Sequence, residues 1–332
     1  MDIIRKIIAV VILSSMMYCA NAVERPVYPC HRLAQAPVID GNMNDEAWKN
    51  IPEASGFFIF KPGGSEKYAV EKQTSFKAGW TADAVYIVVR AEESAPEKMI
   101  ATAKDGLELW SEDSIELFFL PTGAPAYTQL LANSVGSRWN GRAGEGEMDV
   151  KAWEAKAVAG KTEWVLELRI PFSVLAAKAP KEGDEWPVNV ARNIYTGPAD
   201  EHYTCWPPLR TGFNDAVNFG FFVFKGLAAD KATLEEEKEI NAAYFLDMHE
   251  GMKKLAGLAE KYGRELGEAQ KTENQRAEAE KLLGIWGQAA KLAAQSKPDD
   301  VELSSVRRDC IGLPQRSEDC IARGMLATLF KE

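Results

Sequence analysis

The chain has 332 residues, 46% of them hydrophobic, and a formal net charge of −10 at pH 7. This length and apolar content support one large domain or two modest ones with a real core. The acidic balance gives no electrostatic reason to bind nucleic acid or an anionic membrane surface, so neither is expected as a partner.

The first residues have the features of a secretory signal peptide. Arg5 and Lys6 form a short basic start, an apolar run follows over residues 7–17, and Ala20-Asn21-Ala22 is an A-x-A cleavage site. The apolar run is too short to cross a bilayer comfortably. We therefore predict that residues 1–22 are removed after Ala22, that the protein is secreted or periplasmic, and that the mature chain has no transmembrane segment.

Residues 26–226 have the pattern of an all-β domain. Short runs of alternating apolar and polar residues recur between turns rich in Gly, Pro, Asn and Asp. They lie at residues 74–80, 85–90, 114–120, 127–134, 153–158, 162–170, 186–195 and 218–224. Because no long helix separates them, they predict two antiparallel sheets packed as an immunoglobulin-like or jelly-roll-like sandwich. One or two helical turns are expected over residues 45–51, with Asn44 as their cap.

One predicted strand carries a charge that a purely structural strand does not need. Alternation places Ile115, Leu117 and Phe119 on one face and Glu116 on the other. Burying an unpaired carboxylate costs several kcal/mol, so Glu116 needs solvent, a partner or a ligand. Trp110 precedes this strand, where its ring can stand at the rim of the same site. A flat ring beside a carboxylate suits a sugar, whereas the structural alternative makes Trp110 a core residue.

Residues 230–332 predict a helical region appended to the sandwich. Between Thr233 and Ser296 there is no proline, and apolar residues recur at helical intervals. Thr233 with Glu236 forms a capping box, residues 272–274 form the turn of an antiparallel hairpin, residues 297–300 end the second helix, and residues 317–330 form a closing helix. Each apolar stripe must be covered by its hairpin partner, the sandwich or another chain, so self-association through this region is one expectation.

The mature chain keeps four cysteines, Cys30, Cys205, Cys310 and Cys320. An even number in an oxidising compartment predicts disulfides, although the spacing allows three pairings. Cys310 with Cys320 is the local pairing, which would leave Cys30 to meet Cys205. No pair has the C-x-x-C spacing of a zinc site.

Several segments together resemble the family 9 carbohydrate-binding modules, xylanase-associated β-sandwiches in a wider group with the DOMON domains. In chain order the segments are APVIDGNMNDEAW, FKAGWTADAVYIVVRAEE, WSEDSIELFF, WVLELRIPFSVL, WPVNVARN and CWPPLRTGFNDAVNFGFF. They span roughly residues 30–225 and none of the helical region. The resemblance implies a β-sandwich that binds poly- or oligosaccharide without catalysis, as an accessory to polysaccharide breakdown.

The resemblance also implies a set of site residues. The two aromatic rings that hold the sugar correspond to Trp110 and Phe213, and the carboxylate that bonds its hydroxyl groups corresponds to Glu116. Polar residues on the neighbouring strand correspond to Gln129 and Asn133. These are the residue types that bind sugars, because rings stack on C–H faces while polar groups each contribute about 1 kcal/mol.

Some positions depart from the family pattern. The family's Arg between the two polar residues corresponds to Leu131, and a later Gln corresponds to Ala191, with Arg192 beside it as the polar substitute. Two groups that grip the reducing end of a sugar are therefore absent. One ligand of the family's structural calcium corresponds to Glu93, although the neighbouring acids do not form a recognisable calcium loop.

Three other functions remain open. A glycoside hydrolase needs two carboxylates about 5 to 9 Å apart, for which Glu116 with Glu112 could be offered, but no motif supports catalysis and no catalytic residue is assigned. The related DOMON sandwiches include haem-binding redox modules, for which His202 with Met99 or Met148 would supply axial ligands. An envelope or assembly protein would use the helical region to form oligomers.

Overall fold

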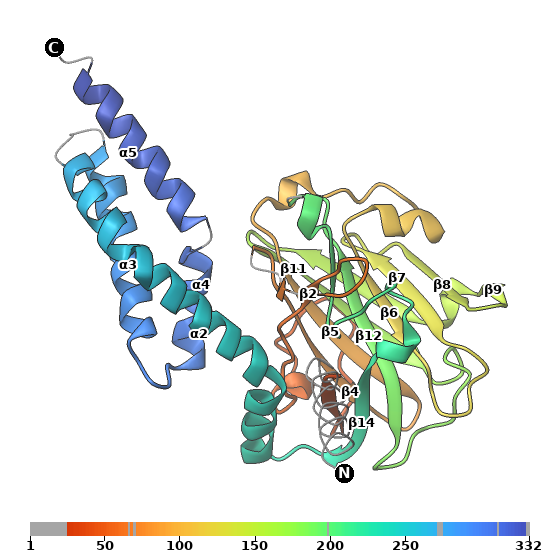
Figure 1. Ribbon diagram of the computed structural model, residues 1–332. Helices are drawn as coiled ribbons and strands as arrows, with labels where there is room; N and C mark the ends of the chain where they lie inside the picture. The colour runs from red at the N-terminus through yellow and green to blue at the C-terminus, as the bar shows by residue number, and fades with distance from the viewer. Residues whose placement is uncertain are drawn as a thin grey trace, which may run out of the picture.

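The computed structural model describes residues 25–65, 67–68, 71–197, 199–270, 275–310 and 312–329. A β-rich body comes first, and a group of helices projects from one side of it (Figure 1). The predicted signal peptide, residues 1–22, and the predicted hairpin turn, residues 272–274, lie outside the described residues.

Within the described residues, fourteen strands form one continuous sheet that curls into a sandwich. The strands are β1 (Val27–Arg32), β2 (Phe58–Ile59), β3 (Lys67–Tyr68), β4 (Thr74–Trp80), β5 (Ala84–Glu92), β6 (Ser114–Phe119), β7 (Thr128–Asn133), β8 (Arg138–Arg142), β9 (Gly146–Glu147), β10 (Glu154–Ala159), β11 (Glu163–Pro171), β12 (Glu185–Asn193), β13 (Tyr203–Cys205) and β14 (Gly220–Leu227). Their order is β10-β11-β5-β4-β1-β14-β12-β6-β7-β8-β9, with β13, β2 and β3 added beside β12.

The predicted sandwich with appended helices is confirmed, but the two predicted antiparallel sheets are one continuous sheet, and two of its strand pairs are parallel. Strand β1 runs parallel to both β14 and β4, and so joins the two halves of the curled sheet. The other strand pairs are antiparallel, including β6 with β7 and β12 with β6. Alternation in a sequence marks a strand but does not encode the direction of its partner, which is why the parallel pairs were not expected.

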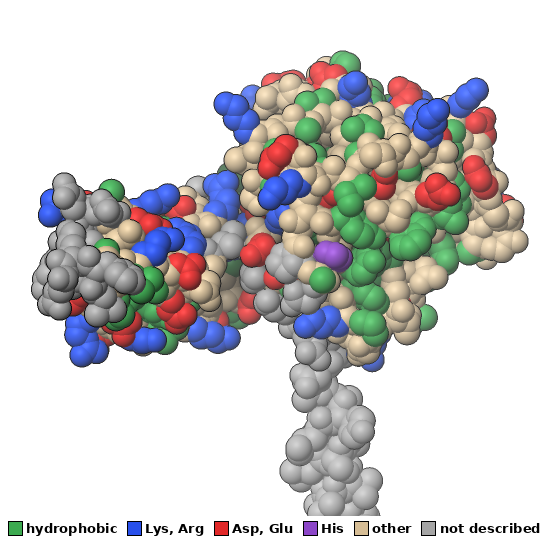
Figure 2. All heavy atoms as spheres, turned by 90° about the horizontal axis from the view of Figure 1, so that it is seen from above, with side chains coloured by type: hydrophobic (Ala, Val, Ile, Leu, Met, Phe, Trp, Pro, Cys, Tyr) green, Lys and Arg blue, Asp and Glu red, His purple; other side chains and the backbone are tan. Residues whose placement is uncertain are grey.

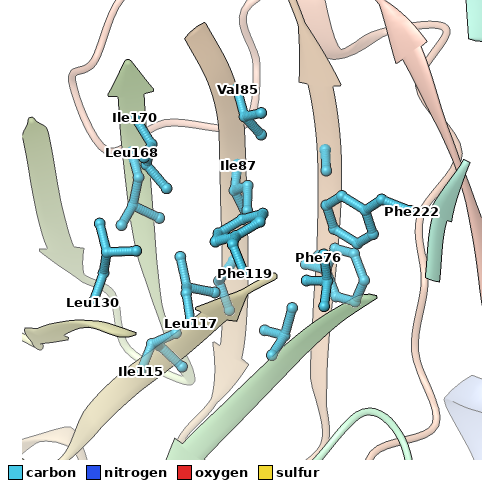
Figure 3. Close-up of a cluster of buried hydrophobic side chains, with 14 of the residues drawn as sticks. Phe76, Val85, Ile87, Ile115, Leu117, Phe119, Leu130, Leu168, Ile170 and Phe222 are labelled. Atoms are coloured by element: carbon cyan, nitrogen blue, oxygen red, sulfur yellow. The ribbon is translucent and has the colours of Figure 1, made fainter. Parts of the chain in front are cut away.

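The core lies between the two halves of the curled sheet. From β6, the side chains of Ile115, Leu117 and Phe119 point into it and are at most 1% exposed, as alternation predicted. Figure 3 shows them beside apolar side chains of the opposite half, such as Ile87 and Leu168. Burying an aliphatic or aromatic side chain contributes about 1.5–3 kcal/mol, so this cluster holds the two halves together. Four tryptophans also belong to this cluster: Trp80, Trp164, Trp186 and Trp206.

A buried carboxylate fastens the turn at the start of the sandwich. Glu167 on β11 accepts hydrogen bonds from Trp48 Nε1 at 2.8 Å and from the backbone N–H groups of Asp40 and Gly41 at 3.0 and 3.1 Å. Gly41 has a φ of +83°, and a Cβ there would lie 2.7 Å from Val158 Cγ2. The Asp40-Gly41 turn and Trp48 are therefore both held by Glu167, whose strand lies far along the sequence.

The helical turn that ends at Trp48 is shorter than predicted. It is a 3-10 helix, η1 (Glu46–Trp48), and its N-cap is Asp45, whose side chain accepts from the Ala47 N–H. The prediction of Asn44 as the cap is wrong, because Asn44 lies one residue too early to reach that N–H.

Four helices follow the sandwich in the described part of the chain: α2 (Asp230–Ala269), α3 (Arg276–Ala293), α4 (Asp300–Cys310) and α5 (Leu313–Leu329). The predicted hairpin corresponds to α2 and α3. Helix α4 begins where the sequence predicted only the end of a helix, and α5 starts four residues before the predicted closing helix. The expected capping box is also wrong, since Ala229 is the N-cap of α2 and Thr233 Oγ1 donates to Asn50 O instead.

Polar side chains dock the helices on the sandwich. Asn241 on α2 is 2% exposed; its Oδ1 accepts from Ser55 N at 2.7 Å, and its Nδ2 donates to Glu53 O at 2.8 Å. On α4, Arg307 forms an ion pair with Glu92 of β5 at 2.6 Å. The helices are therefore tied to the sandwich at two separate elements.

The helices also share a core of their own. Tyr262 of α2 stacks on Trp286 of α3 with 5.0 Å between ring centroids, and Leu266, Leu282 and Leu313 are buried around them. Their apolar stripes are thus covered largely by one another. No helix in the described ranges combines the length and apolar character needed to span a bilayer.

The two predicted disulfides are not formed, because all four cysteines of the described chain are free thiols. Cys30 lies in the main sandwich core, whereas Cys205 lies in a separate buried cluster. Cys310 Sγ faces Met252 Sδ at 4.0 Å, and Cys320 Sγ faces the Gln275 side chain at 3.8 Å. Each thiol has different neighbours, and spacing along the sequence could not show this.

We expect a thiol reagent, without reductant, to label these four cysteines only after the protein is denatured. Burial raises the pKa of the Cys30 thiol and raises that of Cys205 to about 12, so little reactive thiolate exists in the folded state. Mass spectrometry of the labelled protein counts the additions. Two fewer labels in denatured, unreduced protein would reveal a disulfide and contradict the free-thiol arrangement.

Candidate functional site

The candidate site lies on the face of the sheet opposite the core. Strand β6 is central there, because it pairs with β7 on one side and β12 on the other. Since alternate residues of a strand face opposite ways, the register that sends Leu117 into the core sends Glu116 and Phe118 to this face. Glu116 therefore points away from the core, as the alternation in the sequence predicts.

A cavity of about 370 Å³ opens on this face, within the range of small-molecule sites. Its walls are mainly aromatic, and its floor is polar. Figure 2 shows hydrophobic side chains gathered in a patch on the sandwich, with charged side chains spread around it. The lining residues are Phe60, Leu107, Trp110, Glu116, Phe118, Gln129, Asn193, Tyr203, Phe213 and Asn214.

Trp110 stands at the rim of the cavity on a short 3-10 helix, η3 (Leu107–Ser111). Its side chain is 49% exposed, whereas every other tryptophan of the chain is at most 8% exposed. Leu109, the residue before it, is fully buried and anchors the turn. The alternative that Trp110 is a core residue is therefore excluded by the structure.

Two acids after Trp110 fasten this turn. Glu112 Oε1 accepts from the N–H groups of Thr102 and Ala103, both at 2.6 Å. Asp113 accepts from Ile100 N at 2.8 Å and from Tyr195 N at 3.0 Å. Their carboxylates are thus occupied by backbone donors of the neighbouring loops, and neither acid lines the cavity.

Glu116 forms the floor of the cavity and is 5% exposed. Gln129 Nε2 donates to its Oε2 at 2.7 Å, and Asn193 Nδ2 donates to its Oε1 at 2.8 Å. Burial raises the pKa of the Glu116 carboxyl, and the hydrogen bonds from Asn193 and Gln129 oppose that rise without cancelling it. The floor is therefore a carboxylate held between two amide groups.

Four of the six predicted carbohydrate-binding residues come together around this cavity. They are Trp110, Glu116, Gln129 and Phe213. Phe213 lies in the wall, where its ring contacts Phe60 at 5.7 Å and Tyr203 at 6.1 Å between centroids.

The other two predicted residues do not line the cavity. Asn133 is buried; its Nδ2 donates to Glu112 Oε2 at 2.9 Å, so it supports the turn that carries Trp110. Arg192 points to the opposite face of β12, where it is fully buried and donates to Glu92 O at 2.9 Å. The next residue, Asn193, faces the cavity instead. The alternation of residues 189, 191 and 193 along β12 was the sequence signal for it.

Glu93, the predicted calcium ligand, is already neutralised by a side chain. Lys72 Nζ donates to its Oε1 at 2.7 Å, Thr196 Oγ1 donates to its Oε2 at 2.6 Å, and Arg192 lies 3.5 Å away. A calcium site needs six to eight oxygen ligands, whereas this carboxylate faces an ammonium group. These residues do not fit calcium, and in the described part of the chain no group of three or more His, Cys, Asp or Glu could hold a metal ion.

The residues offered for haem are not assembled around the cavity either. His202 packs against Tyr195 at 5.2 Å between ring centroids, and Met99 packs against the main core. Neither they nor Met148 are among the lining residues. The structure therefore gives no axial pair at this site.

The fold and the cavity define a β-sandwich module with an aromatic-walled site on the outer face of its sheet. The chain belongs to the carbohydrate family 9 binding domain-like family, whose family model matches residues 39–227. A search of curated proteins gives no match.

Solved structures resemble the sandwich at low sequence identity. A family 9 carbohydrate binding module from Caldicellulosiruptor kristjanssonii in complex with cellotriose is 18% identical, covers 62% of this chain and 96% of its own, and has a TM-score of 0.45. The same organism's module in complex with glucose is 17% identical, with 60% and 97% coverage and a TM-score of 0.44. A protein from Bacteroides uniformis is 16% identical, with 61% and 100% coverage and a TM-score of 0.48.

Proposed function

We propose that this chain is an exported, non-catalytic glycan-binding protein that assists polysaccharide breakdown. A sugar ring lies between the rings of Trp110 and Phe213, and its hydroxyl groups bond to Glu116, Gln129 and Asn193. Residues 26–226 form the binding module, and residues 230–332 form a helical extension of it.

The half-exposed ring of Trp110 above a polar floor is the observation that carries this proposal. Exposed apolar surface is unfavourable in water, so a large ring held out at a cavity indicates a ligand that covers it. Sugars combine C–H faces, which stack on aromatic rings, with hydroxyl groups, which need acceptors and donors at the edge of the stack. The amide and carboxylate groups on the cavity floor provide both.

Two further observations support the same function. The family to which the chain belongs is described by carbohydrate binding, and its match covers the strands that build the cavity. The basic start, apolar run and A-x-A site before residue 23 support export, which would bring the module to extracellular polysaccharides.

A glycan array followed by fluorescence quenching tests the proposal. We expect the protein to bind at least one class of oligosaccharide, and that oligosaccharide to protect tryptophan fluorescence from iodide, because Trp110 is the accessible tryptophan. Absence of binding across the array would contradict the function. Binding that leaves iodide quenching unchanged would contradict the assignment of the cavity.

A further inference from the structure

The side chains that line the cavity include one carboxyl group and no basic group. Of its lining residues, Glu116 is the acid, and none is Lys, Arg or His. The buried cations of the neighbouring interior, Lys72 and Arg192, are directed to Glu93. A ligand in the cavity therefore meets no cationic side chain.

Hydrogen bonding makes the floor rich in acceptors. A carboxylate only accepts, so both amide NH2 groups turn toward Glu116, and Asn193 Nδ2 also donates to Ser114 Oγ at 3.0 Å. Both hydrogens of Asn193 Nδ2 are thereby engaged within the protein, and the remaining lone pairs of the Glu116 carboxylate are the acceptors that the floor offers. A ligand hydroxyl can therefore donate to Glu116 at the floor.

An anionic sugar meets two penalties in such a site. Its carboxylate or sulfate would lose hydration without gaining a cationic partner, which is costly for any charged group. It would also approach the Glu116 carboxylate in a low-dielectric cavity, where repulsion between like charges is stronger than in water. A hydroxyl or ammonium group meets neither penalty.

We propose that this cavity selects glycans by charge, accepting sugar units that present hydroxyl or ammonium groups and rejecting units that carry carboxylate or sulfate. The inference rests on the proposed function and adds to it the chemical class of the ligand. Glu116 is the residue that sets the selectivity, together with the lack of a basic residue among those lining the cavity.

Affinity electrophoresis with matched polymers tests the inference. Hydroxyethyl cellulose and carboxymethyl cellulose share one backbone and differ in the charge of their substituent, and fully methyl-esterified pectin with polygalacturonate forms a second pair. Chitosan oligosaccharides, added as competitors, probe the ammonium group. We expect the neutral member to retard the protein, the anionic member to bind at least tenfold more weakly, and the amino sugar to compete at least as well as its neutral counterpart.

Two variants of lining residues and one control variant separate the effect of the cavity from that of the net charge of the whole chain. Glu116→Gln should reduce the difference between neutral and anionic polymers, whereas Glu147→Gln, at an exposed position on β9, should not. Asn214→Arg adds a cation at an exposed lining position and should increase binding of the anionic polymer, which keeps the test informative even if Glu116→Gln destabilises the fold.

The outcomes of this test are distinct. Equal binding of neutral and anionic members would overturn charge selection while leaving glycan binding in place. If the preference for neutral polymers persists unchanged in Glu116→Gln and Asn214→Arg, it comes from the net charge of the chain, and the role of the cavity is overturned. Binding of none of these polymers, nor of any array member, would remove the proposed function and this inference together.

Discussion

Replacing Glu93 with Ala is expected to lower the free energy of unfolding by about 3–5 kcal/mol, the usual cost of breaking a buried ion pair. The Glu93 side chain is 0% exposed and that of Lys72 is 6% exposed. Without the carboxylate, the Lys72 ammonium stays buried beside Thr196 with no counter-charge. Thermal unfolding should show a drop in Tm of about 10 °C, while Glu147→Ala, at an exposed position, should change it little.

The difference in stability between wild type and Glu93→Ala should depend on pH, because the pKa of the Glu93 carboxyl is shifted in the folded protein. Burial raises the pKa of the carboxyl, but hydrogen bonds from Lys72, Thr196 and Ala95 outweigh it and hold the pKa below its ordinary value. A lowered pKa stabilises the fold above the pKa of the unfolded chain, about 4.3, and this contribution is lost as the pH falls through the folded-state pKa. The difference in the free energy of unfolding between wild type and Glu93→Ala should therefore be largest at pH 7 and should decrease at acidic pH.

A double variant and a chelator decide whether Glu93 belongs to an ion pair or to a calcium site. If Lys72 is the partner of Glu93, the double variant Glu93→Gln/Lys72→Met should cost less than the sum of the single variants, because it removes the Lys72 ammonium that Glu93→Gln alone would leave without its counter-charge. EDTA should leave the wild-type Tm unchanged. A fall in Tm with EDTA that calcium reverses would contradict the ion-pair assignment and restore Glu93 as a metal ligand.

Alternation in the sequence was sufficient for the long strands and for the orientation of Glu116. Strands such as β4, β6 and β11 have one face in the core, so period 2 is strong and the face of each residue follows from it. The two-residue strands β2 and β9 are too short to show a period, and β1 has a proline and pairs in parallel on both sides. Partners and strand directions depend on tertiary contacts that local pattern does not contain.

The candidate site was predictable wherever one residue could be placed relative to a strand. Trp110 and Glu116 can be placed in this way, whereas the prediction of Arg192 depends only on its position next to Ala191 and not on the face of the strand that it occupies. Alternation places residue 192 on the face opposite to 191 and 193, so the sequence already favoured Asn193. Asn133 could not be assigned in this way, because it has the cavity-facing parity and yet its amide is taken by Glu112.

The final prediction contrasts two tryptophans, Trp110 at the rim of the cavity and Trp164 in the core. Trp110→Ala should reduce glycan affinity at least tenfold, about 1.4 kcal/mol, because it removes a ring on which the sugar stacks. Since Trp110 is 49% exposed, its loss should leave the free energy of unfolding almost unchanged. Trp164→Ala, at a fully buried core position, should instead cost about 3–5 kcal/mol of stability.

Affinity electrophoresis and thermal unfolding of both variants separate the two roles. Trp110→Phe retains a flat ring at the rim, and we expect it to recover part of the affinity that Trp110→Ala loses, because stacking needs an aromatic face rather than an indole N–H. A stable Trp110→Ala variant that binds as tightly as wild type would rule out stacking at this rim. A Trp110→Ala variant that unfolds at markedly lower temperature would show instead that the ring supports the η3 turn, and the loss of binding would then reflect disorder of the site.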